Sequence, residues 1–454
     1  MFIAAVLVAV FVALFSSEVM SAPLRGCTVS ACLNGGVCVN GTNGSFCSCA
    51  LGYRGQYCGT MDVEAVKNEV GMLSTQLKIL QILLNMSKFN IDQVFTDTMD
   101  TILSSQGPRF FIEWITIEHS EASQLRMFSI GTNRHFIGVA TTNQAHALYG
   151  ITIYEIMPNS SLNAIQTIQV EGIRTFQSFS LNDAHYIAIA CSHGNNSTSS
   201  SWLYKWSGFQ FVQRQEITNN GAADVDFIST SQASFLAFSC DLHDSVPVVY
   251  VWDPSNEQFV FYQSIPVMGA VKVHFAMAKD TIYLTVAAVH TAPAVFEFKV
   301  STFKLVDSEI NRNTRDLYPF SVGSFLFLVA LNQFESMRHL NSSVLYRLSG
   351  DHFKEHASLP ISGDHVHYFP VKGEHFLVVA GEQSGSGSVT DVVVHKLDGA
   401  SLVPFQRIPA PSASFVDTFL LPDGCRVLLV SSLSGFPKLY KWASVGLKPN
   451  SCSQ

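Results

Sequence analysis

Six of the ten cysteines fall within residues 27 to 58, which is dense enough to indicate disulfide chemistry. They are Cys27, Cys32, Cys38, Cys47, Cys49 and Cys58. A segment this short has too few apolar residues to form a core, so cross-links are expected to hold it together. Spacing alone leaves fifteen ways to pair six cysteines.

His365 and His367 are candidates for metal chemistry, because two imidazoles on one strand face can bind a metal. In the repeats described below they align with Asp224 and Asp226, so we expect ordinary positions near a central channel. The sequence has no Gly-x-Ser-x-Gly, His-Glu-x-x-His or phosphate-loop motif. We therefore predict no catalytic residue, no cofactor, no metal and no enzyme activity.

The composition limits which classes of protein this chain can belong to. Only 14% of the 454 residues are charged and 47% are hydrophobic, whereas soluble domains average about 25% charged. A chain with 34 Phe and 13 Tyr can bury enough surface to fold, which excludes disorder. The net charge of −8 and the lack of a basic run argue against nucleic acid or an anionic membrane surface as a partner.

Residues 1–22 have the character of a secretory signal peptide. Phe2 to Phe15 is an unbroken apolar run, followed by small residues, with cleavage expected between Ser17 and Ala22. The alternative is an uncleaved anchor, but this run is shorter than the roughly 20 residues a membrane-spanning helix needs. We expect a secreted, extracellular protein with no membrane span.

In a secreted protein the N-glycosylation sequons can carry glycans. They begin at Asn40, Asn43, Asn85, Asn159, Asn195, Asn196 and Asn341. The sequons at Asn195 and Asn196 overlap, so we expect at most one of them to be used.

Residues 61–105 are predicted to form a helical stalk. Its apolar positions alternate at spacings of three and four residues: Val63, Val66, Val70, Leu73, Leu77, Leu80 and Leu84. This narrow stripe favours a coiled coil and a homo-oligomer held through residues 61–105. The alternative is an amphipathic helix packed on the rest of the chain. Gly71 and Ser87 would make a coiled coil marginal.

Three sequence marks repeat seven times after residue 110, at intervals of 43 to 51 residues. A Phe-x-aliphatic unit occurs at Phe128, Phe179, Phe227, Phe275, Phe320, Phe369 and Phe419. An apolar run then ends at a small residue: Ala140, Ala190, Ser239, Ala287, Ala330, Ala380 and Ser431. A third strand is centred near Tyr154, Tyr204, Tyr250, Phe296, Tyr346, His395 and Tyr440.

A fourth strand follows in six copies, several with the form Gln-x-Ile, as at Gln166, Gln215, Gln263 and Gln406. The seventh copy is missing after Trp442, but Phe111 to Ile115 precedes the first repeat and has the right character. We expect this N-terminal strand to complete the last blade. Four short strands repeated seven times predict an all-β fold, a seven-bladed β-propeller over residues 110–445. Residues 446–454 are left as a C-terminal tail.

The cysteine cluster at residues 23–59 resembles an EGF-like domain, with Asn34, Gly35 and Gly36 and a closing Cys-x-Cys before Gly52 and Tyr53. The resemblance implies the pairs Cys27–Cys38, Cys32–Cys47 and Cys49–Cys58. Calcium-binding members carry acidic residues before the first cysteine, and residues 22–26 contain none. We therefore predict no calcium site.

The repeats resemble the EAR (epitempin, EPTP) repeat. Its pattern is met by Tyr204-Lys205-Trp206, by Gln215 with Ile217, and by Gly221 to Phe227. Proteins with this repeat include the leucine-rich glioma-inactivated proteins and thrombospondin-type laminin G domain proteins. Leu348 and Leu397 replace the expected Trp, so repeats five and six depart most.

Four cysteines remain outside the cluster. Cys425 and Cys452 are expected to form a disulfide that holds the tail to the last blade. Cys191 and Cys240 occupy the same position in adjacent repeats, too far apart for a disulfide, so we expect buried free thiols.

These observations together predict a secreted adhesion or extracellular-matrix protein whose propeller binds a protein partner, with the EGF-like module and stalk as spacer. A carbohydrate-binding propeller and a passive matrix component are the alternatives. Exposed Trp with Asp or Asn on one face would favour carbohydrate. Specificity is expected in the loops after the small-residue positions: 141–149, 191–201, 240–247, 331–343 and 381–390. Glycans at Asn195 and Asn341 would shield part of that face, so the opposite face and the channel mouth are equal alternatives.

Overall fold

The computed structural model describes most of the chain between residues 109 and 444. The gaps are 120, 143–148, 193–198, 243, 290, 309, 311–313, 333–342, 384–389 and 400, and further described pieces are 37–41, 44–49, 53–54 and 60–61. Every regular element in these residues is a β-strand. The predicted signal peptide (1–22), the stalk beyond Met61 and the tail (446–454) lie outside the described residues. None of the described residues forms a helix long and apolar enough to cross a membrane.

Four short strands are described in the region expected to be EGF-like. Strand β1 (Val37–Gly41) pairs antiparallel with β2 (Gly44–Ser48), and β3 (Tyr53–Arg54) pairs with β4 (Thr60–Met61). Cys38 and Cys47 lie opposite each other in the first pair. Cys49 is disulfide-bonded. The three pairings implied for this module therefore stay predictions.

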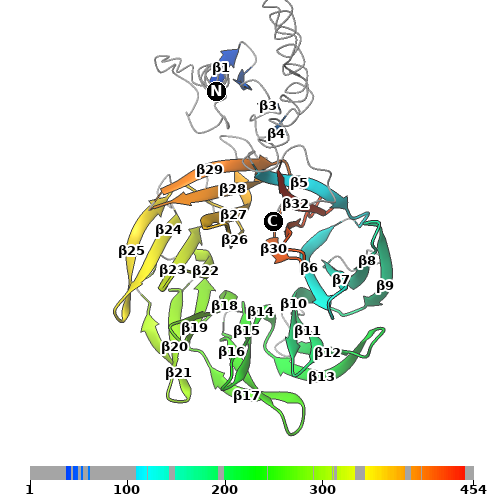
Figure 1. Ribbon diagram of the computed structural model, residues 1–454. Helices are drawn as coiled ribbons and strands as arrows, with labels where there is room; N and C mark the ends of the chain where they lie inside the picture. The colour runs from blue at the N-terminus through cyan, green and yellow to red at the C-terminus, as the bar shows by residue number, and fades with distance from the viewer. Residues whose placement is uncertain are drawn as a thin grey trace, which may run out of the picture.

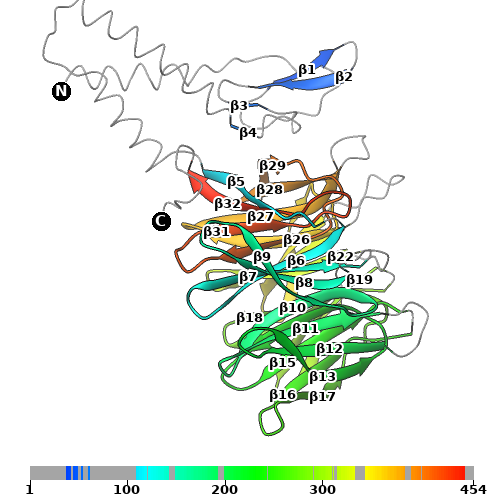
Figure 2. The same cartoon turned by 90° about the vertical axis from the view of Figure 1, so that its right-hand side faces the viewer.

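Seven four-stranded antiparallel sheets follow one another around a ring (Figure 1). We call them blades 1 to 7 in chain order, beginning with β6 to β9. The predicted seven-bladed β-propeller is confirmed. Figure 2 shows the ring from its edge, with blade 7 toward one end and blade 3 toward the other.

Each blade runs outward from the centre of the ring. The inner strands are β6 (Ala122–Ile130), β10 (Ile173–Leu181), β14 (Ala222–Ser229), β18 (Ala270–Ala278), β22 (Thr314–Val322), β26 (His365–Val371) and β30 (Val416–Leu420). The second strands are β7 (Arg134–Thr141), β11 (Ala184–Cys191), β15 (Ser234–Cys240), β19 (Thr281–Ala288), β23 (Phe325–Asn332), β27 (Glu374–Gln383) and β31 (Arg426–Val430).

The third strands are β8 (Gly150–Ile156), β12 (Ser199–Trp206), β16 (Val248–Asp253), β20 (Ala294–Lys299), β24 (Ser343–Ser349), β28 (Thr390–Asp398) and β32 (Lys438–Ser444). The outer strands are β9 (Leu162–Ile168), β13 (Phe211–Asn219), β17 (Gln258–Ser264), β21 (Thr302–Asp307), β25 (His352–Leu359), β29 (Ser401–Ile408) and β5 (Arg109–Thr116). We call the face that carries the turns from inner to second strand and from third to outer strand the short-turn face. The opposite face is the long-loop face.

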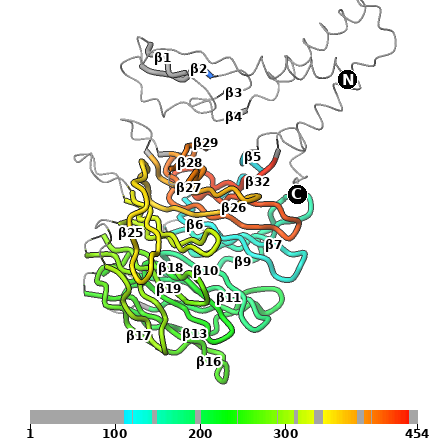
Figure 3. The backbone as a smooth tube through the Cα atoms, turned by 60° about the vertical axis from the view of Figure 1, so that its left-hand side comes forward, coloured from blue at the N-terminus to red at the C-terminus, as the bar shows by residue number. Residues whose placement is uncertain are grey.

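The ring is closed by the first and last strands of the propeller. Strand β5 pairs antiparallel with β32 as the outer strand of blade 7, so the two lie side by side (Figure 3). Arg109 lies opposite Ser444, and the Lys438 ammonium is 2.8 Å from the Glu113 carboxylate. The prediction that Phe111 to Ile115 complete the last blade is confirmed.

The core consists of apolar clusters between neighbouring blades, one for each of the seven seams. The second strands supply much of it: in β15 every residue is buried, and in β11 all but the first. A strand covered by a neighbouring sheet on both faces must be apolar throughout, which explains why these runs do not alternate with polar residues.

The strand pairing shifts some of the predicted repeat positions by one residue: the Phe position in blades 3 and 4, and the small-residue position in blade 5. Phe128 pairs with Phe136, and the equivalent residues of blades 3 and 4 are Ile228 and Ala276, not Phe227 and Phe275. In blade 5 the residue equivalent to Ala140 is Leu331, which lies opposite Asp316, not Ala330. Two adjacent apolar residues satisfy the same period-two pattern in either register, so the sequence could not distinguish them.

Glutamines in the outer strands connect neighbouring blades. The Gln215 side chain accepts a hydrogen bond from the Phe259 N–H at 2.9 Å and donates one to the Phe259 carbonyl at 2.7 Å. We call this arrangement a glutamine clasp. The other clasps join Gln166 to Phe211, Gln263 to Phe303, and Gln406 to Phe111. The Gln-x-Ile mark thus reflects a seam between blades.

Three seams have no glutamine at the clasp position. Between blades 4 and 5, Asp307 accepts a single bond from the Phe353 N–H at 3.0 Å. Blades 5 and 7 have Ala357 and Ile115 at this position of the register, where neither side chain can make a hydrogen bond. The ring is therefore not held equally at every seam.

Gly138 is the tightest position in the second strand of blade 1. A Cβ built there would lie 2.7 Å from Cζ of Phe176, whose side chain is fully buried in blade 2. We expect Gly138→Ala to lower the free energy of unfolding by about 1 to 3 kcal/mol through overpacking. Denaturant unfolding would measure this. The control is Gly138→Ala in a Phe176→Leu background, which lacks the ring atoms that the new Cβ would meet. An undiminished loss in that background would contradict the steric reason.

Candidate functional site: the ring centre and the short-turn face

Two positions on each inner strand form two layers at the centre of the ring. The layer nearer the long-loop face contains Gln124, Thr175, Asp224, Lys272, Asp316, His365 and Phe415. The other layer contains Arg126, Gln177, Asp226, His274, Tyr318, His367 and Asp417. We call these two layers the polar centre. His365 and His367 are equivalent to Asp224 and Asp226, as predicted.

Ion pairs and hydrogen bonds connect the polar centre from blade to blade. The Arg126 guanidinium is 2.8 Å from Asp417, and His274 Nε2 is 2.8 Å from Asp316. Asp316 also accepts a hydrogen bond from the Val366 N–H in the next blade, at 3.2 Å. Charges buried at this depth are stable only when they are paired and hydrogen-bonded in this way.

Phe415 lies over the centre on the long-loop side. Its ring lies 4.3 Å from the His365 ring, 5.0 Å from Cζ of Arg126 and 5.7 Å from Nζ of Lys272. Lys272 belongs to blade 4, across the ring from blade 7, so Phe415 spans the centre (Figure 1). Phe415 is only 5% exposed. Phe415 therefore covers part of the polar centre on this side, where Thr175 and Lys272 stay partly exposed.

Burial controls the protonation of the central histidines. It lowers the pKa of His367 to about 4, although the Asp417 carboxylate opposes the change, and it places the pKa of His365 well below its ordinary value. Burial also disfavours the charged form of His274, but the Asp316 carboxylate outweighs it and raises that pKa. His365 and His367 are thus neutral at pH 7. The described residues contain no group of three or more His, Cys, Asp or Glu placed to hold a metal.

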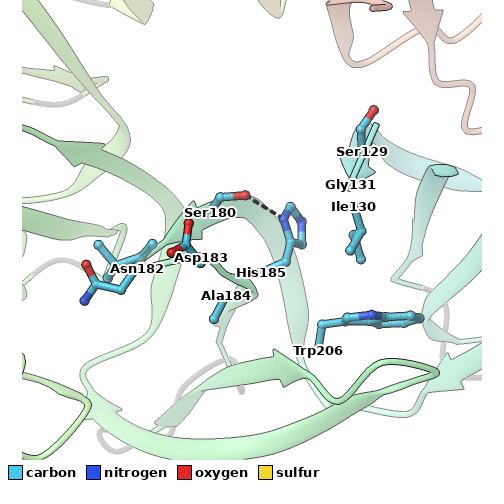
Figure 4. Close-up of a pocket in the computed structure, with 10 residues that line it drawn as sticks. Ser129, Ile130, Gly131, Ser180, Asn182, Asp183, Ala184, His185 and Trp206 are labelled. Atoms are coloured by element: carbon cyan, nitrogen blue, oxygen red, sulfur yellow. Dashed lines mark hydrogen bonds between the residues drawn. The ribbon is translucent and has the colours of Figure 1, made fainter. Parts of the chain in front are cut away.

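A depression of about 410 Å³ opens on the short-turn face between blades 1 and 2 (Figure 4). Its lining includes Ser129 and Ile130 of blade 1, and Asn182, Asp183 and Trp206 of blade 2. Asn182 and Asp183 form the tight turn between β10 and β11, and both have positive φ, 49° and 60°. The sequence did not predict this depression, because its residues come from two repeats.

His185 in this depression hydrogen-bonds Ser180, with 3.0 Å between Nδ1 and Oγ. The pair resembles half of a hydrolase triad, but burial lowers the pKa of His185 to about 4, which makes it a poor base at pH 7. Its Nε2 is buried with no hydrogen-bond partner among the described residues, so no carboxylate orients the ring. Ser129 and His135 form the same pair in blade 1 at 2.7 Å. The pair is a feature of the repeat.

Large apolar side chains are exposed around the short-turn face. They are Met157, Phe209, Met277, Val300, Phe325 and Leu420, with Phe209 70% and Val300 88% exposed. They belong to blades 1, 2, 4, 5 and 7. Leu433 and Phe436, between β31 and β32, are exposed on the long-loop face.

The loops predicted to carry specificity join second to third strands on the long-loop face. Of these five loops, only 240–247 is described almost completely. There Asp241 forms an ion pair with Arg174 at 3.1 Å. Asn195, Asn196 and Asn341 lie outside the described residues, as does Asn85. Asn159 lies in the exposed turn between β8 and β9, where its side-chain oxygen accepts bonds from the Ser161 N–H and hydroxyl.

The propeller cysteines differ in state. Cys191 and Cys240 are buried free thiols, and burial raises the pKa of each to about 12, which makes them unreactive at neutral pH. Cys425 is disulfide-bonded. Its partner lies outside the described residues, so the Cys425–Cys452 pairing stays a prediction.

Comparison with known proteins supports the repeat assignment. A family model for the EPTP domain matches residues 162–207. The match begins with the outer strand of blade 1 and ends after the third strand of blade 2, so the sequence unit straddles a seam. The chain is also 24% identical over 365 residues to a mouse (Mus musculus) thrombospondin-type laminin G domain and EAR repeat-containing protein, covering 71% of this chain and 51% of that protein. The predicted resemblance to EAR/EPTP repeat proteins is confirmed, and the chain spans about half the length of this curated relative.

Two solved structures resemble the chain at lower identity. One is a crystal structure of BBS1N in complex with ARL6DN, with a TM-score of 0.49, 12% identity, and coverage of 74% of this chain and 98% of that chain. The other is the β-propeller domain of the Trilobed protease from Pyrococcus furiosus, with a TM-score of 0.41, 11% identity, and coverage of 71% and 94%.

Proposed function

We propose that this protein is a secreted, non-enzymatic adhesion or extracellular-matrix protein whose propeller binds a protein partner through the short-turn face. The observation that carries the proposal is the set of exposed apolar side chains on that face, from Met157 to Leu420. Interfaces are built around such anchors, and truncating a few of them removes most of the binding energy. The similarity to a mouse EAR repeat protein with a laminin G domain supports an extracellular role.

The short-turn face also has the rigidity that a docking surface needs. Several of its turns are held by positive-φ pairs, such as Lys279 with Asp280 and Val300 with Ser301. These turns are anchored on both sides by paired strands. A surface that is already ordered loses little conformational entropy on binding.

Saturable binding of the secreted chain to cells or matrix tests this proposal. We expect Phe209→Ser with Val300→Ser to weaken binding at least tenfold. The matched control is Leu433→Ser with Phe436→Ser, which removes exposed apolar side chains from the opposite face. Equal loss for both pairs would contradict a role for the short-turn face.

Enzymatic treatment of the cells separates the candidate partners. Protease treatment should abolish binding if the partner is a protein. Loss after glycan removal alone would favour the carbohydrate-binding alternative. Retention in an insoluble matrix fraction with no saturable binding would favour a passive matrix component.

We also propose that residues 61–105 form a homo-oligomer, which would multiply weak contacts by avidity. Light scattering of the deglycosylated protein, with and without these residues, measures the mass in solution. A dimer or trimer that becomes a monomer on deletion is expected. Monomers in both cases would mean that the apolar stripe of residues 61–105 packs against the rest of the same chain.

A further inference from the structure

The depression between blades 1 and 2 has a chemistry that none of the roles above uses. Its volume of about 410 Å³ lies within the roughly 300 to 1,000 Å³ typical of small-molecule sites. Figure 4 shows Asn182 and Asp183 on one side, the Ser180–His185 pair in the middle, and Ile130 with Trp206 on the other. One side of the depression is thus polar and the other apolar.

The charges of the lining limit what can bind. No Lys or Arg lines the depression, and the Arg134 guanidinium, 5.6 Å from the Trp206 ring, is paired with Glu155 at 2.7 Å. The lining therefore offers no unpaired cation to attract a phosphate, a sulfate or a carboxylate. Asp183 is its one carboxylate, and a lone carboxylate does not hold a divalent cation. Asn182 and Asp183 are exposed and free to make hydrogen bonds to a ligand. A neutral ligand that carries many hydroxyls matches these polar groups together with the apolar side.

We propose that this depression binds a neutral pyranose unit of a glycan. The flat C–H face of the sugar would lie against Trp206 and Ile130. The Asn182 amide both donates and accepts hydrogen bonds, and the Asp183 carboxylate accepts two, which together match vicinal hydroxyl groups. This proposal goes beyond the proposed binding of a protein partner and does not depend on it.

The same position in the other blades does not repeat this chemistry. Trp252 and Trp442 are equivalent to Trp206. Trp442 is buried, and Trp252, which is half-buried like Trp206, belongs to a blade whose turn at 230–233 has no Asn or Asp. The turns equivalent to Asn182 and Asp183 contain Lys279 with Asp280 in blade 4, and Lys372 with Gly373 in blade 6. Asn, Asp and an accessible Trp therefore meet at the seam between blades 1 and 2. A single shallow site of this kind should bind one sugar unit weakly, with Kd on the order of 1 mM.

Saturation-transfer NMR on the full secreted chain tests the site. The probes are neutral methyl glycosides of mannose, glucose, galactose and N-acetylglucosamine, with N-acetylneuraminic acid as the anionic contrast. We expect at least one neutral glycoside to bind saturably and the anionic sugar not to bind. Absence of saturable binding by every neutral glycoside up to tens of millimolar would overturn the proposal, as would equal binding of the anionic sugar.

Matched variants locate the binding. Asn182→Gly with Asp183→Gly removes both side chains and permits the positive φ, and should raise Kd at least tenfold. Lys279→Gly with Asp280→Gly makes the same change in a turn of nearly the same φ angles, 47° and 63°, and should leave Kd within twofold.

Trp206→Phe covers the case in which the first variant does not fold. It keeps an aromatic ring beside Phe136 and Phe211 and should raise Kd several-fold, with the thermal unfolding midpoint little changed. An unchanged Kd in both blade 2 variants, or an equal loss in the blade 4 variant, would place the binding elsewhere. Neither result would bear on whether the propeller binds a protein partner.

Discussion

Replacing Gln406 by methionine should lower the free energy of unfolding by about 2 to 4 kcal/mol. Methionine has a similar length but cannot replace the bonds between the Gln406 amide and the Phe111 N–H and carbonyl, both 2.9 Å long. Phe111 is only 3% exposed, so water cannot easily take over either group. A buried backbone group left without a partner costs about 1 to 3 kcal/mol. Denaturant unfolding with a secretion-competent chain would measure the loss.

The control for Gln406 is the same change at Gln263. That clasp makes the same two bonds to Phe303 but is less deeply buried, so Gln263→Met should cost less, about 1 kcal/mol. Gln406 also holds β5, the strand that closes the ring. Equal losses at the two positions would show that burial and ring closure add nothing to the clasp.

Stability should fall steeply as the pH drops from 6.5 toward 5. Burial lowers the pKa values of His185 and His367 to about 4 and places that of His365 well below the ordinary value, whereas the pKa of His274 is raised. The unfolded chain titrates these histidines near pH 6.5. Below that pH it binds three protons that the folded chain does not bind. His274 does not offset them, because both the folded and the unfolded chain carry its proton below pH 6.5. A net uptake that approaches three protons on unfolding removes roughly 3 to 4 kcal/mol per pH unit.

His367→Gln should flatten this pH dependence by roughly 1 kcal/mol per pH unit. Glutamine can keep hydrogen bonds to Tyr318 and Thr418, which lie 3.1 and 3.2 Å from the two imidazole nitrogens, and it does not titrate. The other charged groups around this ring, Arg126, Arg426 and Asp417, are unchanged in the variant.

The measurement is the unfolding midpoint of the unchanged chain and of His367→Gln between pH 7.5 and 5, and the quantity compared is the slope of the midpoint against pH. His352→Gln, at an exposed histidine of β25, is the control and should leave the slope unchanged. A slope for His367→Gln equal to that of the unchanged chain would mean that His367 takes up its proton in the folded state.

The repeats made the ring predictable. The marks in the sequence reflect packing requirements of the blades: an apolar second strand and a third strand in every blade, and a glutamine clasp in four of them. The missing seventh outer strand could be found at Phe111 to Ile115 because the sequence unit begins with an outer strand, as the EPTP match at 162–207 also does. The register was less secure, since Phe227 and Ile228 satisfy the apolar pattern equally well.

The features of the site could not be predicted in the same way, because they join residues from different blades. Phe415 resembles any core phenylalanine in the sequence, and only the ring brings it against Lys272 of blade 4. Asn182 and Trp206 are likewise distant in the chain from Ile130. The predicted loops drew attention to the long-loop face, whereas the depression and most of the exposed apolar side chains identified above lie on the short-turn face.

The pairing of Arg109 with Ser444 has a mechanical consequence. The chain enters and leaves the propeller at neighbouring points of one antiparallel strand pair, so tension between the two ends would peel β5 from β32. Peeling breaks the hydrogen bonds of the pair one after another, whereas shear would load them together. Tension between residue 109 and a partner docked elsewhere on the ring would pull on β5 together with the Gln406 clasp. The resistance of the ring to force would therefore depend on where the force is applied.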